Sequence, residues 1–196
     1  MEGLLGGAFD PPHNGHLALA RGALERFALE RLLVLVVAAP GHKPVETDVD
    51  HRLALARLAF ADLPRTDVEV DPHAYTVDSV RQWASPEALF LIGADQLADF
   101  LSWRAPDEIL RHVRLGVGTR PGSSQESLDL VLAKLERPDR VEFFEIPPVP
   151  VSSSEIRDYV RRGEPIDAFV PASVAREIER AGLYQAFDRR RKGKLG

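Results

Sequence analysis

The chain begins with a short apolar stretch that leads into Gly6-Gly7-Ala8-Phe9-Asp10-Pro11-Pro12-His13-Asn14-Gly15-His16-Leu17. Glycines at the end of a predicted strand let the backbone turn tightly and approach a ligand. The prolines stop the strand, and we expect His13 and His16 to lie on one face of the first turn of a helix. Paired imidazoles beside free N–H groups at the positive end of a helix dipole favour phosphate binding, with Gly15 leaving room for a flat ligand group.

Beyond this stretch, short apolar runs alternate with segments of helical period. The run at 32–37 is apolar throughout, which is typical of a strand covered on both faces of a parallel sheet. Further strands are predicted at 68–70, 88–92, 113–117 and 141–146, and helices at about 51–61, 76–84, 94–101, 106–111 and 124–135. This alternation predicts an α/β protein with a Rossmann-like open parallel sheet and helices on both faces.

The last quarter of the chain has a different pattern. Prolines at 147, 148 and 150 stop any regular element, and a helix is predicted over 152–162. A second helix follows Pro171, with Gly182 at the position expected of a C-terminal cap. We therefore predict one domain over 1–184, with a small C-terminal helical part over about 152–184, followed by a flexible basic tail at 185–196.

Composition excludes several classes of protein. A net charge of −5 disfavours binding to a nucleic-acid backbone, and the absence of cysteine excludes disulfide frameworks and thiolate metal sites. The longest apolar run, 32–39, is too short to cross a membrane, and the first residues lack the features of a signal peptide. We expect a cytoplasmic protein without nucleic-acid or membrane partners. A homo-oligomer remains open, and no metal site is predicted from the residues.

A second candidate phosphate site lies at Val151-Ser152-Ser153-Ser154-Glu155-Ile156-Arg157. Ser152 with Glu155 fits a capping box, which needs no ligand. Hydroxyl groups, free N–H groups and an arginine on a first helical turn also suit a polyphosphate. The residues alone leave these two interpretations equally open.

Residues 7–16 resemble the GTFDPxHxGH signature of the nucleotidylyltransferases, and 151–157 resembles their ISSTxIR motif. Three middle segments, at 39–44, 74–78 and 91–104, resemble the PxxPHK, SYTxDT and IGxDxLxxFxxW segments of the bacterial nicotinate-nucleotide adenylyltransferase family. The resemblance covers residues 2–184. The chain departs from the family at Ala8, where threonine or serine is usual, at Gly41 in place of proline, and at Ser154 in place of threonine.

The resemblance implies adenylyl transfer from ATP to nicotinate mononucleotide, giving deamido-NAD and pyrophosphate in NAD biosynthesis. It implies catalytic roles for His16, His13 and Arg157, and a Mg²⁺ ion that arrives with ATP and is held mostly by substrate and water. The implied ATP-binding residues are Gly7, Ala8, Phe9, His13, Gly15, His16, Gly93, Asp95, Ser153, Ser154 and Arg157. The implied residues for the acceptor nucleotide are His42, Lys43, Thr76, Trp103 and Arg104.

Two alternatives remain. Phosphopantetheine adenylyltransferase shares the first motif but is shorter and lacks the segment around Trp103. A noncatalytic nucleotide sensor is the second alternative. The presence of both histidines and Arg157 argues against a sensor, because binding alone needs fewer groups.

Overall fold

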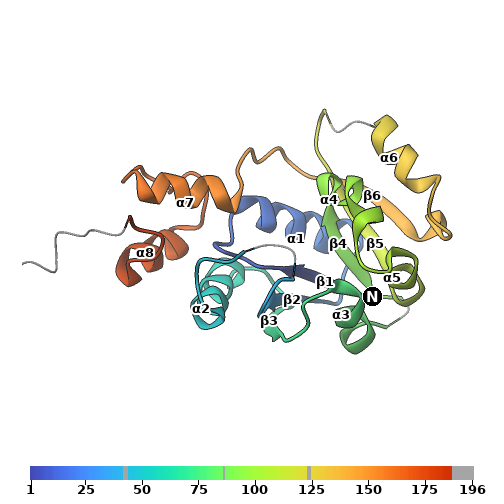
Figure 1. The fold of residues 1–196 in the computed structure, drawn as a ribbon, viewed down its shortest axis with the longest axis horizontal. Helices are drawn as coiled ribbons and strands as arrows, with labels where there is room; N and C mark the ends of the chain where they lie inside the picture. The colour runs from blue at the N-terminus through green and yellow to red at the C-terminus, as the bar shows by residue number, and fades with distance from the viewer. Residues whose placement is uncertain (42–43, 86, 123–124, 187–196) are drawn as a thin grey trace, which may run out of the picture.

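The structure is a computed structural model that describes residues 1–41, 44–85, 87–122 and 125–186. Its centre is one parallel sheet in the order β3-β2-β1-β4-β5-β6 (Figure 1). The strands are β1 (Glu2–Gly7), β2 (Arg31–Val37), β3 (Thr66–Asp71), β4 (Leu89–Gly93), β5 (Arg114–Thr119) and β6 (Val141–Glu145). The α-helices are α1 (Asn14–Arg26), α2 (Val49–Phe60), α3 (Thr76–Trp83), α4 (Ala94–Ala98), α5 (Pro106–His112), α6 (Gln125–Leu132), α7 (Ser153–Arg161) and α8 (Ala172–Ala181).

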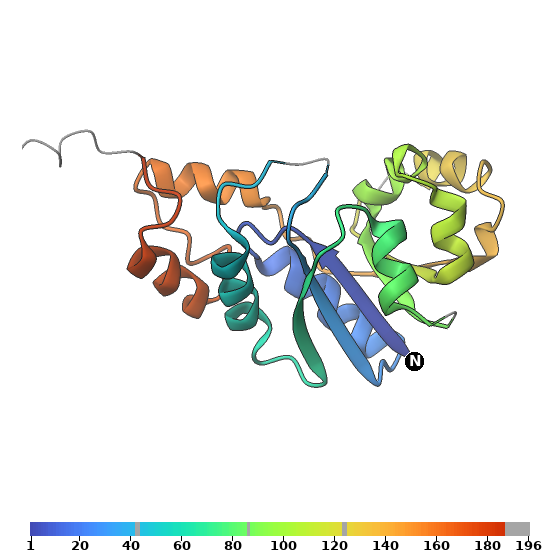
Figure 2. The same cartoon turned by 60° about the horizontal axis from the view of Figure 1, so that its bottom comes forward.

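The two faces of the sheet carry separate hydrophobic cores. Successive residues of a strand point to opposite faces, so Leu5 packs in one core and Leu4 in the other. The core around Leu5 takes side chains from α1, α2, α7 and α8, and the core around Leu4 takes them from α3, α4, α5 and α6. Helix α1 packs on β1, β4, β5 and β6, and α2 packs on β2 and β3; Figure 2 shows α1 behind β1. The predicted α/β fold with helices on both faces is confirmed.

The C-terminal helices pack into the core around Leu5. Ile156 of α7 and Val174 of α8 are fully buried there, and both helices lie at the end of the molecule remote from α6 (Figure 1). Helix α8 ends at Gly182, whose φ of 64° is in the left-handed region, as the predicted cap requires. Apart from 185–186, the predicted basic tail lies outside the described residues.

Two predicted helices differ in detail. Helix α1 begins at Asn14, and His13 is its N-cap with extended backbone rather than its first helical residue. The helix predicted over 94–101 is interrupted at Asp99, and a short 3₁₀ turn follows at Phe100–Ser102. The Ser102 hydroxyl donates to the Asp99 carbonyl oxygen at 2.7 Å. A side chain that takes a backbone acceptor in this way competes with continued α-helix.

The strand order places one edge of the sheet in position to bind a ligand. Strands β1 and β4 are neighbours, and the order reverses between them, since β1 leads to β2 on one side and β4 to β5 on the other. In open α/β sheets, ligands bind beyond the carboxyl ends of the strands at such a switch point. Gly7 and Gly93 end these two strands, and the predicted phosphate motif follows Gly7 directly. Within the described residues, no helix is long and apolar enough to cross a membrane.

Candidate active site

His13 and His16 cap the start of α1 with their own imidazole rings. Nδ1 of His13 accepts a hydrogen bond from the Gly15 N–H at 3.1 Å, and Nδ1 of His16 accepts one from the His13 N–H at 3.2 Å. The two ring centroids lie 3.8 Å apart, which confirms the predicted pairing of the imidazoles. Because Nδ1 of each ring is an acceptor, the proton of each neutral ring is at Nε2. The pair therefore consists of two oriented Nε2–H donors.

The environment keeps His13 uncharged at neutral pH. Burial and, to a smaller extent, the positive charge of Arg120 lower its pKa from 6.5 to about 4, against an opposing effect of the negative charge of Glu155. Arg120 directly follows β5, so a third strand end contributes to the electrostatics of this edge. A ring that stays neutral at pH 7 keeps Nδ1 as the acceptor that the helix cap needs.

Phe9 supports the imidazole pair from the core side. Its backbone has a φ of 50°, which is sparsely populated for a residue with a side chain. Its ring is buried, with its centroid 5.0 Å from that of His16 and 5.7 Å from that of Phe60. A Cβ atom on Gly7 would lie 3.1 Å from this ring. Any contact of Phe9 with ATP must therefore involve its backbone.

Gly15 makes room for the His13 ring, and its predicted role toward a ligand stays a prediction. A Cβ atom there would lie 2.9 Å from Cε1 and Nδ1 of His13. The His13 ring therefore lies against the Gly15 backbone. Glycine is needed at this position so that the N-cap imidazole can reach the Gly15 N–H.

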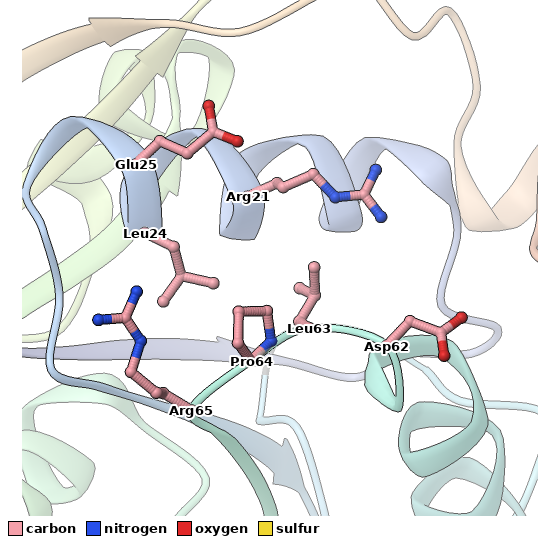
Figure 3. Close-up of a pocket in the computed structure, with 7 residues that line it drawn as sticks. All are labelled: Arg21, Leu24, Glu25, Asp62, Leu63, Pro64 and Arg65. Carbon is pink, nitrogen blue, oxygen red and sulfur yellow. The ribbon is translucent and has the colours of Figure 1, made fainter.

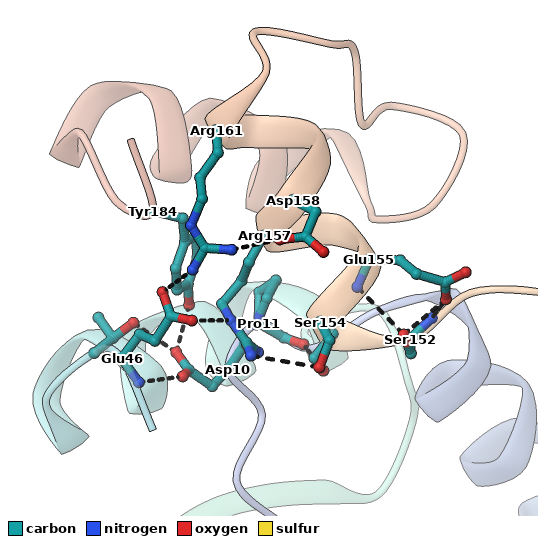
Figure 4. Close-up of polar contacts among 12 residues, drawn as sticks. Asp10, Pro11, Glu46, Ser152, Ser154, Glu155, Arg157, Asp158, Arg161 and Tyr184 are labelled. Atoms are coloured by element: carbon teal, nitrogen blue, oxygen red, sulfur yellow. Dashed lines mark hydrogen bonds and ion pairs between the residues drawn. The ribbon is translucent and has the colours of Figure 1, made fainter. Parts of the chain in front are cut away.

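The second predicted phosphate motif lies directly against the first (Figure 4). The Ser153 hydroxyl donates to the Pro11 carbonyl oxygen at 2.8 Å, and Nη1 of Arg157 donates to the Asp10 carbonyl oxygen at 2.7 Å. Nη2 of Arg157 also lies 3.4 Å from the Ser154 hydroxyl. Ser153, Ser154 and Arg157 are therefore brought to the loop that leads into α1. Ser152 and Glu155 form the expected capping box.

Glu46 occupies the outer side of the Arg157 guanidinium. Nε of Arg157 donates to a Glu46 oxygen at 2.9 Å, and Arg161 pairs with the other oxygen (Figure 4). The hydrogen bond from Arg161 is the largest effect on the pKa of Glu46 and lowers it; burial opposes this, and the hydrogen bond and charge of Arg157 lower the pKa further. Arg157 therefore already binds a carboxylate at the position where the sequence predicts a phosphate.

The remaining predicted residues lie at the ends of other elements. Gly93 is the N-cap of α4, its N–H donates to Gln96 at 3.1 Å, and Asp95 is exposed in the first turn. Thr76 is the first residue of α3. His42 and Lys43 lie outside the described residues.

Trp103 and Arg104 approach the start of α3. The Arg104 guanidinium lies 4.9 Å from the ring centroid of Tyr75 and 3.8 Å from the Asp78 carboxylate, so it contacts residues on both sides of Thr76. Trp103 is half-buried, with its ring 5.3 Å from that of Phe100. The two segments predicted to enclose the acceptor ring are thus in contact.

No role was predicted for two buried charged residues: Asp10, which lies within residues 7–16 (the histidine motif), and Arg52, which donates to the carbonyl oxygen of Ala8 in that motif. Arg52 could have been noticed, because it precedes Leu55 and Ala56 by three and four residues and so falls on the apolar face of its helix. Within the described residues, no group of three or more histidine, aspartate or glutamate side chains could hold a metal ion.

A separate hollow of about 270 Å³ lies between the end of α1 and residues 62–65 (Figure 3). Arg65 accepts a hydrogen bond from the N–H of Leu32 near the start of β2, so this hollow is at the amino-terminal edge of the sheet. None of the predicted site residues lines it.

A Rossmann-like sheet with an imidazole pair and a serine–arginine helix start at its switch point is the arrangement of a nucleotidyltransferase. In agreement, the sequence model of the cytidylyltransferase-like family matches residues 4–159. The chain belongs to the nicotinate-nucleotide adenylyltransferase family: it is 37% identical to the probable nicotinate-nucleotide adenylyltransferase of Bordetella avium, across 93% of this chain and 97% of that protein. It is 36% identical to the Thermomicrobium roseum protein of the same description, across 95% and 92% of the two chains.

Solved structures agree on the fold. The Plasmodium falciparum nicotinic acid mononucleotide adenylyltransferase complexed with NaAD superposes with a TM-score of 0.75. The match covers 93% of this chain and 96% of that one at 17% sequence identity. The resemblance inferred from the sequence motifs is therefore confirmed at the level of family and fold.

Proposed function

We propose that this protein transfers the adenylyl group of ATP to nicotinate mononucleotide, forming deamido-NAD and pyrophosphate. The observation that carries the proposal is the pair of oriented imidazoles that caps α1 at the switch point between β1 and β4. The names of the relatives that align along nearly the whole chain support nicotinate mononucleotide as the acceptor.

In the proposed reaction, a phosphate oxygen of the mononucleotide attacks the α-phosphorus of ATP in line. The new P–O bond forms as the bond to pyrophosphate breaks, without a covalent enzyme intermediate. His16 donates from Nε2–H to the α-phosphoryl oxygens, where negative charge develops in the transition state. Neutral His13 donates in the same way to the neighbouring phosphate, and both rings are held by their Nδ1 contacts before the substrate binds.

The first turn of α7 receives the leaving pyrophosphate. Its N–H groups and the Arg157 guanidinium supply donors and positive charge. Because Arg157 binds Glu46 in this structure, phosphate oxygens take the place of that carboxylate when ATP is bound. Magnesium enters the proposal as the ion that accompanies the triphosphate, bound by phosphate oxygens and water, and it neutralises phosphate charge.

The segments at Thr76 and at Trp103–Arg104 form the proposed pocket for the pyridine ring. An indole face can stack on a pyridinium, but stacking does not distinguish a carboxylate from a carboxamide. Donors around the exocyclic group make that distinction, because an amide NH₂ would face another donor. An unpaired buried polar group costs about 1–3 kcal/mol, so we expect a preference for the acid on the order of 10²-fold in kcat/KM.

The test measures pyrophosphate release from ATP and Mg²⁺ with nicotinate mononucleotide, its amide or phosphopantetheine as acceptor. Turnover with the nicotinate nucleotide, at least about 10²-fold above its amide in kcat/KM, supports the proposal. Turnover with phosphopantetheine alone identifies the alternative transferase, and ATP binding without turnover identifies a sensor. Equal kcat/KM for the acid and the amide contradicts the assignment of the pocket.

A pair of threonine variants sharpens this test. Thr76→Val removes one hydroxyl from the proposed pocket, so the preference for the acid should shrink about tenfold, the value of one hydrogen bond. Thr66→Val is the matched control, because Thr66 is the first residue of β3 and lies at the amino-terminal ends of the strands, away from the proposed pocket. The control should keep the wild-type preference.

A further inference from the structure

Arg52, in the first turn of α2, is fully buried beside the histidine motif. Nη1 donates to the carbonyl oxygens of Ala8 at 2.8 Å and Val37 at 2.7 Å, and Nη2 donates to that of Ala38 at 2.7 Å. Nε donates to the carbonyl oxygen of Thr47 at 3.0 Å. One guanidinium therefore joins the residue after β1 to both ends of the β2–α2 connection, of which the structure describes residues 38–41 and 44–48.

Placing this charge inside the protein is costly. No carboxylate of the described residues lies within ion-pair distance of Arg52, so backbone carbonyl dipoles alone accept its hydrogen bonds. An apolar side chain would fill the same volume without the desolvation penalty of a buried ion. The guanidinium group is planar and its N–H donors point in fixed directions. It therefore fixes the positions of the four carbonyl groups relative to one another, which an apolar side chain could not do.

Asp10 holds the same connection from the other side. Its carboxylate accepts from the Glu46 N–H at 2.7 Å and from the Thr47 hydroxyl at 2.5 Å. It also accepts from the Tyr184 hydroxyl at 2.8 Å and is itself buried. The Thr47 carbonyl oxygen thus accepts from Arg52, and the Thr47 hydroxyl donates to Asp10. Asp10 belongs to the histidine motif, and Arg52 is bonded to it through Ala8.

We propose that Arg52 and Asp10 are positioning residues that fix the β2–α2 connection against the histidine motif and so set the separation of the two reacting phosphates. The inference rests on the proposed function, in which the motif binds ATP and Thr76 lines the acceptor pocket; the connection reaches that pocket through Gly41, whose N–H donates to the Ala74 carbonyl oxygen at 3.4 Å. Neither residue touches substrate. They affect the distance between the attacking phosphate oxygen and the α-phosphorus of ATP, and the line along which the oxygen attacks. The rate of a direct transfer, without a covalent intermediate, depends strongly on both.

This role predicts that loss of either residue lowers kcat and leaves the KM values of both substrates nearly unchanged. A misplacement of about 1 Å in reacting geometry costs about 10²-fold in rate, whereas each substrate keeps its own binding groups. Arg52→Lys keeps the positive charge but loses the fork, and it should lower kcat by about 10- to 100-fold. Both KM values should stay within about threefold of wild type, because the binding contacts of each substrate are retained.

The control for this variant is Arg57→Lys, an exposed position on the same helix, which should keep wild-type kcat. Rates are expressed per folded enzyme, with the folded fraction measured by thermal unfolding at the assay temperature. A purely structural role would lower the melting temperature and leave kcat per folded molecule unchanged. A kcat within twofold of wild type in folded Arg52→Lys overturns the inference.

A second pair of variants tests the proposal if Arg52→Lys does not fold. Thr47→Val and Tyr184→Phe each remove one hydroxyl bound to Asp10 Oδ1, but only Thr47 belongs to the β2–α2 connection. We expect kcat to fall about three- to tenfold for Thr47→Val and to change less than twofold for Tyr184→Phe. Equal kcat values for the two variants contradict the inference. Wild-type protein without adenylyl transfer to any mononucleotide contradicts the proposed function instead.

Discussion

Replacement of His13 by asparagine should remove a defined part of the dependence of stability on pH. The pKa of His13 is about 4 in the folded protein and 6.5 without the fold, so between these values only the unfolded chain binds the proton. The stability that depends on neutral His13 is therefore complete above pH 6.5 and is lost as the pH falls towards 4. At about 1.4 kcal/mol per pKa unit, wild type should lose about 2 kcal/mol between pH 7 and pH 5 from this group.

Asparagine suits the comparison because its side-chain oxygen can accept from the Gly15 N–H, as Nδ1 of His13 does, and it does not titrate. Urea unfolding at pH 7 and pH 5 gives the free energy of unfolding for wild type, for His13→Asn and for a control, His112→Asn, whose partly exposed side chain lies at the end of α5. The control should keep the wild-type loss, and His13→Asn should lose about 2 kcal/mol less. The same loss in all three proteins would refute the assignment of a buried neutral imidazole at the helix start.

Two further predictions concern catalysis and the support of the site. His16→Ala should cost about 3–4 kcal/mol in kcat, with little change in the KM for ATP, because it removes a donor to developing charge; a kcat within a few-fold of wild type contradicts this. Arg157→Ala should raise the KM for ATP and also lower the free energy of unfolding by about 2 kcal/mol, because a charged donor leaves the Asp10 carbonyl oxygen. Arg161→Ala, one turn further along α7, is the control, because it also removes a bond to Glu46. Steady-state kinetics and denaturant unfolding should give a KM for ATP and a free energy of unfolding near those of wild type.

The elements of the fold could be predicted because their signals are local. The apolar run at 32–37 is β2 in the structure, and Ser152 with Glu155 forms the capping box that their spacing indicates. The helix predicted over 94–101 was wrong at its end, because the bond from Ser102 to the Asp99 carbonyl oxygen depends on a side-chain rotamer. Apolar patterning contains no information about that rotamer.

The candidate site was predictable only in part. The spacing of His13 and His16 placed their rings together, but it did not show that each ring would bind a backbone N–H of the motif. The pairing of Arg157 with Glu46 joins residues 111 positions apart, and the four acceptors of Arg52 come from three separate segments. Contacts of this kind arise from tertiary packing, so no local pattern in the sequence indicates them.

The contact between Tyr184 and Asp10 joins residues 174 positions apart and affects how the site is assembled during synthesis. When the histidine motif leaves the ribosome, α7, α8 and Tyr184 have not yet been translated. The first strands and helices can form one after another, but the loop that leads into α1 obtains its bonds from Ser153, Arg157 and Tyr184 only near the end of translation. A nascent or truncated chain can thus carry the complete histidine motif while lacking the contacts that hold it in place.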